Sequence, residues 1–381
     1  MSEDEYTEVT NQSWFGRIGG AFKGILVGII LVIIAFPVLF WNEGRAVKRY
    51  KTLEEGAGAV ISVSANAIAA ENNGKLVHIS DIADTENVLT DSEFGVSVKA
   101  LKLKRVVEMY QWKESSSSKT KKKIGGGTET VKTYSYSKTW SDNKIDSSSF
   151  KKSATHTNPR SFPYSSRQYT ASEISVGAFT LSKSLVNKIG GYQDFPVNKI
   201  PPLLDGKVQQ IDSGFYIGAN PASPQIGDVR IMFKVVKPKE VSVMAMQAKN
   251  TFEPYATSVG GVIDLLESGK LSAAQMIQQQ QDNNKVLSWV LRLVGFVLMF
   301  IGFNLIFRPL SVLADVLPIL GSVVGVGTGL VSFLSSIVLS ALTIAVAWVF
   351  YRPLVAVILI AVIVGAIIVL KLKMKKNHGV S

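Results

Sequence analysis

Residues 25–41 read ILVGIILVIIAFPVLFW, an unbroken apolar run that begins shortly after Lys23. A helix needs about 20 apolar residues to cross a bilayer, so this run suffices when residues 21–24 are added and the Lys23 side chain extends to the headgroups. A cleaved signal peptide is the alternative, but no small-x-small cleavage site follows Trp41. We therefore expect an uncleaved transmembrane helix over 21–41.

The C-terminal part of the chain is more apolar still. Residues 286–307 carry a single charge, Arg292, whose long side chain can reach the membrane interface. The apolar run over 309–370 is too long for one helix at 1.5 Å per residue. We expect it to break at the two Arg-Pro pairs, 308–309 and 352–353, because proline favours a helix start.

These segments predict an α+β membrane protein with four transmembrane helices and a mostly β domain outside the cytoplasm. Lysines follow the last apolar segment and place the C-terminus in the cytoplasm, because basic residues are retained on that side. Four spans then place the N-terminus there too. The predicted parts are a cytoplasmic tail 1–20, helix 21–41, a β-rich domain 42–285, helix 286–307, an interfacial amphipathic segment 308–322, helix 323–350, helix 351–370 and a basic cytoplasmic tail 371–381.

The middle domain alternates short segments rich in β-branched and aromatic residues with Gly, Asn, Ser and Pro turns, which is typical of strands. The predicted strands are Leu76–Ile79, Val96–Leu103, Val106–Trp112, Thr133–Trp140, Phe215–Gly218, Val229–Val236 and Glu240–Met246. Aromatic residues that share parity on 106–112 and 133–140 suggest that these two strands form a long hairpin. Towards the membrane, 272–275 read SAAQ, which fits a capping box opening a helix, either a stalk or a flexible neck before the second span.

The predicted hairpin has a polar, lysine-rich tip over 114–132, whose composition cannot bury a core and indicates a mobile, solvated loop. Its basic side chains are Lys119, Lys121, Lys122 and Lys123. Contact with anionic lipid or cell-wall polymer is one interpretation, and a plain soluble loop is the other. Net charge is +12 without a recognisable nucleic-acid-binding module, so we expect no nucleic-acid partner.

Small residues recur every four positions in the C-terminal apolar region and predict close helix contacts, either within the chain or between copies. They are Gly321, Gly325, Gly329, Ser332, Ser336 and Ser340. The charges expected at the membrane interface are Arg292, Arg308, Asp315 and Arg352. Asp315 is the only acidic residue after position 282, and we expect it to pair with Arg308 at headgroup depth.

Little in the sequence points to catalysis. His78, His156 and His378 lack metal-ligand spacing, and the chain has no cysteine, so neither a thiolate metal site nor a disulfide is possible. Walker, GxSxG and dinucleotide-binding motifs are absent. We expect no catalytic residues, metal or cofactor, although serine and lysine are plentiful enough to leave a Ser/Lys pair open.

Four stretches resemble the transmembrane protein 43 family, also called LUMA: NEGRAVK at 42–48, KRVVEMYQW at 104–112, GDVR at 227–230 and WVFYRPL at 348–354. The resemblance implies four transmembrane helices, both termini in the cytoplasm or nucleoplasm, and a large luminal domain. In animals it implies a protein of the inner nuclear membrane and endoplasmic reticulum that organises membrane complexes. The lysine-rich insertion and the lack of cysteine look like a bacterial member, so lamin and emerin binding are not carried over.

The sequence as a whole favours a non-enzymatic scaffold that organises or senses the membrane through its β-rich domain. The expected partners are membrane lipids, a second copy of the chain and unidentified membrane or envelope proteins. The expected location is the bacterial inner membrane with the domain in the periplasm, or the endoplasmic reticulum or inner nuclear membrane in a eukaryote. An envelope enzyme acting on lipid or cell-wall polymer and a channel built from the C-terminal helices are the alternatives.

Overall fold

The computed structural model describes residues 5–197, 208–211, 214–353 and 357. The chain divides into two compact units. Unit 1 comprises Met1–Thr10, Glu55–Lys119 and Thr130–Gln278, and unit 2 comprises Asn11–Glu54, Thr120–Glu129 and Gln279–Ser381. Apolar helices therefore occur at both ends of the chain and flank a β-rich middle, which confirms the predicted α+β class.

The helices are α1 (Trp14–Ala59), α2 (Lys183–Lys188), α3 (Ala273–Ala314) and α4 (Pro318–Tyr351), with 3-10 turns η1 (Ala70–Asn72) and η2 (Ser147–Ser149). The strands are β1 (Glu5–Gln12), β2 (Ile61–Ser62), β3 (Leu76–Asp84), β4 (Val88–Asp91), β5 (Val96–Lys99), β6 (Lys102–Lys122), β7 (Thr128–Ser141), β8 (Arg167–Thr170), β9 (Ser175–Val176), β10 (Phe179–Thr180), β11 (Gln193–Asp194), β12 (Val208–Ile211), β13 (Gly214–Ile217), β14 (Val229–Val236), β15 (Lys239–Ala248), β16 (Thr251–Glu253), β17 (Tyr255–Ala256), β18 (Val262–Ile263) and β19 (Leu265–Ser268).

Two sheets form the framework of unit 1. The first has the order β1-β7-β6-β14-β13-β12, with β11 paired to β14 and β8 paired to β6. The second has the order β10-β9-β3-β15-β16, with β19 paired to β15 and β2 paired to β3. Strand β14 runs antiparallel to β6 in the register Phe233↔Arg105, and β15 runs antiparallel to β3 in the register Met244↔His78. Both of these pairs join strands that are far apart in the sequence, whereas β12–β13 and β13–β14 are antiparallel pairs of consecutive strands.

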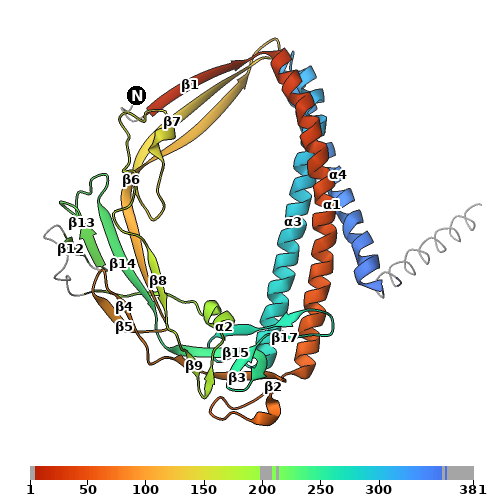
Figure 1. Cartoon of the computed structure of the whole chain (residues 1–381). Helices are drawn as coiled ribbons and strands as arrows, with labels where there is room; N and C mark the ends of the chain where they lie inside the picture. The colour runs from red at the N-terminus through yellow and green to blue at the C-terminus, as the bar shows by residue number, and fades with distance from the viewer. Residues whose placement is uncertain (1–4, 198–207, 212–213, 354–356, 358–381) are drawn as a thin grey trace, which may run out of the picture. The chain divides into compact units, whose positions relative to one another are not determined.

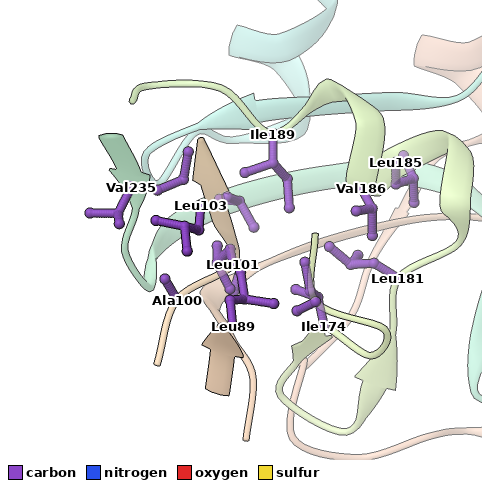
Figure 2. Packing of buried hydrophobic residues seen from close by; sticks show 14 of the residues in the cluster. Leu89, Ala100, Leu101, Leu103, Ile174, Leu181, Leu185, Val186, Ile189 and Val235 are labelled. Carbon is purple, nitrogen blue, oxygen red and sulfur yellow. The ribbon is translucent and has the colours of Figure 1, made fainter. Parts of the chain in front are cut away.

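The core of unit 1 draws side chains from both sheets and from α2. Along β14 the residues Val229, Ile231, Phe233 and Val235 are buried while the residues between them are less so, which is the period-2 pattern of a strand with one face on a core. Figure 2 shows part of this cluster, including Leu101 and Leu103 of the β6 region with Leu185 of α2. Each predicted strand overlaps an observed one, and β14 has the predicted bounds, but the predicted strand Val96–Leu103 is divided between β5 and β6.

The start of α3 forms the predicted capping box. The Gln275 backbone N–H donates to Ser272 Oγ over 3.2 Å, and the Ser272 backbone N–H donates to Gln275 Oε1 over 2.8 Å. The helix that begins here continues without a break to Ala314. The stalk alternative is therefore confirmed, and the polar tract within it is helical.

Three helices are long and apolar enough to cross a membrane: α1, α3 and α4. They lie side by side in unit 2, where Ala35 and Leu39 of α1 pack with Met299 of α3 (Figure 1). Each is surrounded on its remaining faces by exposed aliphatic side chains, as lipid-facing helices require. The predicted helix 351–370 and the basic tail 371–381 lie almost entirely outside the described residues.

The predicted helix breaks fall differently. Pro309 lies inside α3, so the break expected at 308–309 is wrong, and the predicted interfacial segment 308–322 is divided between two helices. The chain turns at Asp315–Leu317 instead, and Pro318 takes the first position of α4, where its missing N–H costs nothing. The other predicted break is correct, because α4 ends at Tyr351 and Arg352 caps it.

The residues before α1 form a strand rather than the tail predicted over 1–20. Strand β1 lies beside β7 in the first sheet. Within unit 1 the Tyr134 hydroxyl donates to Glu8 over 3.3 Å, and Lys151 pairs with Glu8 over 3.1 Å. The Tyr6 and Tyr134 rings lie 6.0 Å apart. Main-chain and side-chain contacts thus hold the N-terminal strand in the β-rich unit.

The pairing of β1 predicts the compartment of the N-terminus. A strand hydrogen-bonded to a sheet shares the sheet's side of the membrane, whereas a single crossing by α1 puts residues 7 and 223 on opposite sides. If the pairing of β1 holds in the membrane, a single cysteine at Thr7 should react with a membrane-impermeant maleimide whenever one at Ser223 does. The chain has no native cysteine to give background. A cysteine at Ser381, which lies outside the described residues and which the sequence predicts to be cytoplasmic, serves as the comparison. Protection of Thr7 together with Ser381 would support the cytoplasmic N-terminus expected from the sequence and contradict the pairing of β1 in the membrane.

Candidate functional site

A buried cluster of polar contacts in unit 2 lies where the apolar run of α1 ends. Glu43, two residues after Trp41, has no exposed surface. Its carboxylate accepts from Arg292 of α3 at Nε (2.7 Å) and Nη2 (2.9 Å), and from Trp348 Nε1 of α4 over 2.8 Å. One carboxylate therefore joins all three apolar helices. A buried charge is tolerated only with such partners, because removing it from water is costly.

Aromatic rings enclose the cation of this pair. The Arg292 guanidinium lies 4.8 Å from the centroid of Trp289 and 6.0 Å from that of Trp348. The negative faces of the indoles attract the cation and shield it from lipid. Arg292 does not extend alone to the interface, as the sequence suggested, but is held by Glu43 and two tryptophans.

Polar contacts continue towards the end of α1. The Asn42 side chain donates to the Ser288 carbonyl over 3.1 Å, and Arg45 donates to Asn284 Oδ1 over 2.9 Å and to Ser288 Oγ over 3.0 Å. Asn284 in turn donates to the Ala46 carbonyl over 2.9 Å. These bonds fix the register between α1 and α3 where both helices leave the apolar region.

Gly44 completes this site by its lack of a side chain. A Cβ at Gly44 would lie 2.6 Å from Cζ of Tyr351, which is inside the ring's contact distance. Phe40, one turn earlier, packs against Phe350 and Tyr351 at centroid distances of 5.6 and 5.2 Å. The end of α4 can therefore rest directly on α1. We call Asn42, Glu43, Gly44, Arg45, Arg292, Trp348 and Tyr351 the three-helix lock.

A second buried ion cluster lies at the other end of the apolar region. The Asp315 side chain is 2% exposed and pairs with Arg17 over 2.5 Å and with Lys122 over 2.6 Å. Trp14 Nε1 donates to the Val312 carbonyl over 2.8 Å. The expected pairing of Asp315 with Arg308 is wrong, because the carboxylate turns towards α1 and the β6–β7 turn.

The lysine-rich tip is part of this cluster rather than a free loop. Strands β6 and β7 continue to Lys122 and from Thr128, so most of the segment predicted to be mobile is paired strand. The Gly125 N–H donates to the Val316 carbonyl over 3.1 Å, and Arg17 donates to the Gly126 carbonyl over 2.5 Å. A Cβ at Gly126 would lie 2.3 Å from the Trp14 ring.

The four predicted contact lysines have different surroundings. Lys122 pairs with Asp315, and Lys123 pairs with Glu129 over 2.7 Å. Lys119 and Lys121 are exposed, as a solvated strand requires. Whether any of them touches anionic lipid or polymer stays a prediction.

The two predicted small-residue stripes differ in their packing. Ser332, Ser336 and Ser340 are buried on one face of α4, and Ser340 Oγ lies 3.3 Å from Sδ of Met299 on α3. A Cβ at Gly329 would meet no atom within 4 Å. A Cβ at Gly325 would only touch Ser311 at 3.9 Å. Gly321 in the first turns of α4 is buried against Asp315 in the preceding α3–α4 turn. The serines therefore pack within the chain, whereas Gly325 and Gly329 leave open space.

Helices α1 and α3 approach each other closely at glycines that were not predicted to form a helix contact. A Cβ at Gly28 of α1 would lie 2.5 Å from the Gly302 carbonyl oxygen, and a Cβ at Gly302 of α3 would lie 2.8 Å from the Gly28 carbonyl oxygen. Gly295 similarly receives the side chain of Leu39. Gly24 and Gly28 form the GxxxG spacing that could have indicated this contact.

His78 and His156 make structural contacts in unit 1, and His378 lies outside the described residues. His78 Nδ1 faces Ser62 Oγ at 3.2 Å, and Nε2 lies 2.9 Å from the Leu271 carbonyl. Burial lowers the pKa of His78, so the ring is neutral near pH 7 and links β3 to the loop before α3. His156 stacks on Tyr136 with centroids 4.0 Å apart. Among the described residues, no three His, Asp or Glu side chains gather as metal ligands.

Comparison with known proteins gives one consistent family. The sequence model described as Transmembrane protein 43 matches residues 109–353. Transmembrane protein 43 of Rattus norvegicus is 33% identical over 94% of this chain and 92% of its own length, and that of Homo sapiens is 32% identical over 92% and 90%. The Transmembrane protein 43 homolog of Drosophila melanogaster is 30% identical over 71% of this chain and 73% of its own. No solved structure matches.

Replacing Glu43 with glutamine should destabilise the helices. The change leaves Arg292 without its counter-charge in a nearly buried position, which should lower the free energy of unfolding by about 3 kcal/mol. Thermal melting of the full chain in detergent would measure the loss. Glu54→Gln, an exposed carboxylate on the same helix, is the control. Adding Arg292→Met to Glu43→Gln should restore part of the stability, because the unpaired cation is removed. Equal melting temperatures for Glu43→Gln and Glu54→Gln would contradict the lock.

Leucine at Gly302 should force α1 and α3 apart. The new side chain would overlap the Gly28 carbonyl and Val32, so we expect a loss of about 1–3 kcal/mol or more in detergent melts. The matched variant Gly329→Leu should leave the melting temperature unchanged, because its Cβ meets open space. Equal destabilisation by both changes would contradict the close contact between Gly28 and Gly302. A lower oligomer mass for Gly329→Leu alone, measured by light scattering, would support self-association through that stripe.

Proposed function

Because this chain belongs to the transmembrane protein 43 family, we propose that it is a non-enzymatic membrane scaffold whose β-rich unit organises partner proteins or senses the bilayer. It is a membrane protein by its three long apolar helices and by its relatives. The β-rich unit faces the non-cytoplasmic compartment, and the lysines after residue 370 lie in the cytoplasm. In a bacterium that compartment is the periplasm, and in a eukaryote it is the lumen of the endoplasmic reticulum or nuclear envelope.

The three-helix lock is the observation that carries this proposal. Glu43, Arg292 and Trp348 satisfy one another, so these polar groups hold helices in place instead of facing a substrate or an ion path. The neighbouring bonds of Asn42 and Arg45 serve the same end. An assembly built this way holds the three helices of unit 2 in one fixed arrangement, which suits a scaffold better than a gated pore.

The proposed partners are membrane lipids, a second copy of the chain and membrane or envelope proteins. Unit 1 offers exposed apolar side chains for protein contact, with Val88 of β4 61% exposed and Ile82 of β3 51% exposed. The open space at Gly325 and Gly329 of α4 supports contact with a second copy. These residues are accessible in the single chain, so each can be tested directly.

Photocrosslinking in intact membranes tests the scaffold. A benzophenone amino acid at Val88 should give adducts of discrete, reproducible mass that mass spectrometry identifies as the same proteins in repeated preparations. The same group at the exposed polar position Ser223 is the control for random capture. No protein adduct above that control would contradict the proposal. Turnover of an envelope lipid or glycan by the purified full chain, or ion flux through it in proteoliposomes, would favour an enzyme or a channel instead.

A further inference from the structure

A pocket of about 480 Å³ opens in unit 2 beyond the three-helix lock. It lies between the last turns of α1 that leave the apolar region and the end of α4. The residues that give it chemical character are Tyr50, Lys51, Glu54, Tyr351, Arg352 and Pro353. None of them is engaged in the ion pairs of the lock.

The charges of this pocket favour an anion. Lys51 and Arg352 line it against a single carboxylate, Glu54, and neither cation forms a salt bridge within the part of the chain that the structure describes. The Arg352 guanidinium is oriented by Trp348, whose ring centroid lies 5.7 Å away. Two phenols, Tyr50 and Tyr351, add hydroxyl donors. A phosphate takes charge-assisted hydrogen bonds from such a set, with arginine as the preferred donor.

The position of the pocket along the helices indicates that the anion is a lipid headgroup. On α4 the pocket begins at Tyr351, directly after the apolar run and beside Gly44, which lies about 4.5 Å beyond Trp41 at 1.5 Å per residue. On α1 its lining runs from Val47 to Glu54, about 9 to 20 Å beyond Trp41. The headgroup layer occupies the ~5–8 Å outside the hydrocarbon core, so the α4 side with Arg352 lies at headgroup depth, and the long Lys51 side chain can extend towards it along α1 from the water side. The neighbouring side chains Trp41 and Phe350 are 60% and 69% exposed, and they offer an apolar surface to acyl chains.

We propose that this pocket binds the phosphate headgroup of an anionic phospholipid, with Arg352 and Lys51 on the phosphate and the acyl chains along the exposed faces of α1 and α4. The bound lipid bridges two helices whose contact depends on Gly44 and Tyr351. The site is separate from the lysine-rich tip of the β6–β7 hairpin, whose Lys122 is already paired with Asp315.

Native mass spectrometry of the full chain in neutral detergent, with added phosphatidylglycerol or phosphatidylcholine, tests this site. The wild-type chain should retain phosphatidylglycerol preferentially. The double variant Lys51→Gln with Arg352→Gln should lose about 30-fold in phosphatidylglycerol affinity, because each cation near an anionic headgroup contributes about fivefold. Phosphatidylcholine binding should stay unchanged.

Lys48→Gln is the matched control, because Lys48 is exposed on the same helix less than one turn away and does not line the pocket. Selective loss in the pocket variant, with Lys48→Gln like wild type and both variants melting normally, is the expected result. Equal losses in both variants would show diffuse charge attraction and overturn the site. Full displacement of the lipid by equimolar glycerol 3-phosphate would overturn the assignment to a lipid and identify a site for free phosphate. If the double variant melts early, the single change Lys51→Gln should still reduce retention about fivefold, and no reduction would count against the proposal.

Discussion

A carboxylate at the end of an apolar helix can remain ionised only if other groups of the protein replace the water it loses. Glu43 meets this requirement with two bonds from Arg292 and one from Trp348, and the three donors come from helices that are far apart in sequence. The order of the helical unit follows from that constraint. Once the charge is buried, α3 and α4 have no freedom to move away from α1 without exposing an unpaired ion.

The sequence was sufficient where one local pattern decides the outcome. A short segment of β-branched and aromatic residues between turn residues predicted Val229–Val236, and the residue types and spacing of Ser272 and Gln275 predicted their reciprocal bonds. Helix breaks were less predictable, because two Arg-Pro pairs looked equivalent. Pro309 remains inside α3, whereas Pro318, which the sequence reading did not weigh, begins α4. Proline permits a helix start but does not require one, and tertiary contacts of Asp315 decide the turn.

The partners of charged groups could not be derived from the sequence, because they depend on which helices become neighbours. Asp315 had Arg308 close in sequence but pairs with Arg17 and Lys122. In the sequence, Glu43 drew notice only within the stretch 42–48 that resembles the family. A single acid and a single arginine at the ends of two apolar segments could nevertheless have predicted an ion pair between them. The contact between Gly28 and Gly302 could not be predicted for a similar reason. Glycines repeated every four residues within one helix are visible in the sequence, whereas single glycines that meet across two helices are not.

The two ion clusters together specify the register of α1 against α3. Along α1, Arg17 and Glu43 are about 39 Å apart, and along the α3 region Arg292 and Asp315 are about 35 Å apart, at 1.5 Å per residue. The small mismatch is within the reach of two arginine side chains, so both pairs form at once. A slip of one residue would rotate α1 by about 100° and turn both of its charged side chains away from their partners. The middle of the bundle adds the close approach of Gly28 and Gly302 to this alignment, and its outward faces are free to carry aliphatic side chains that face lipid.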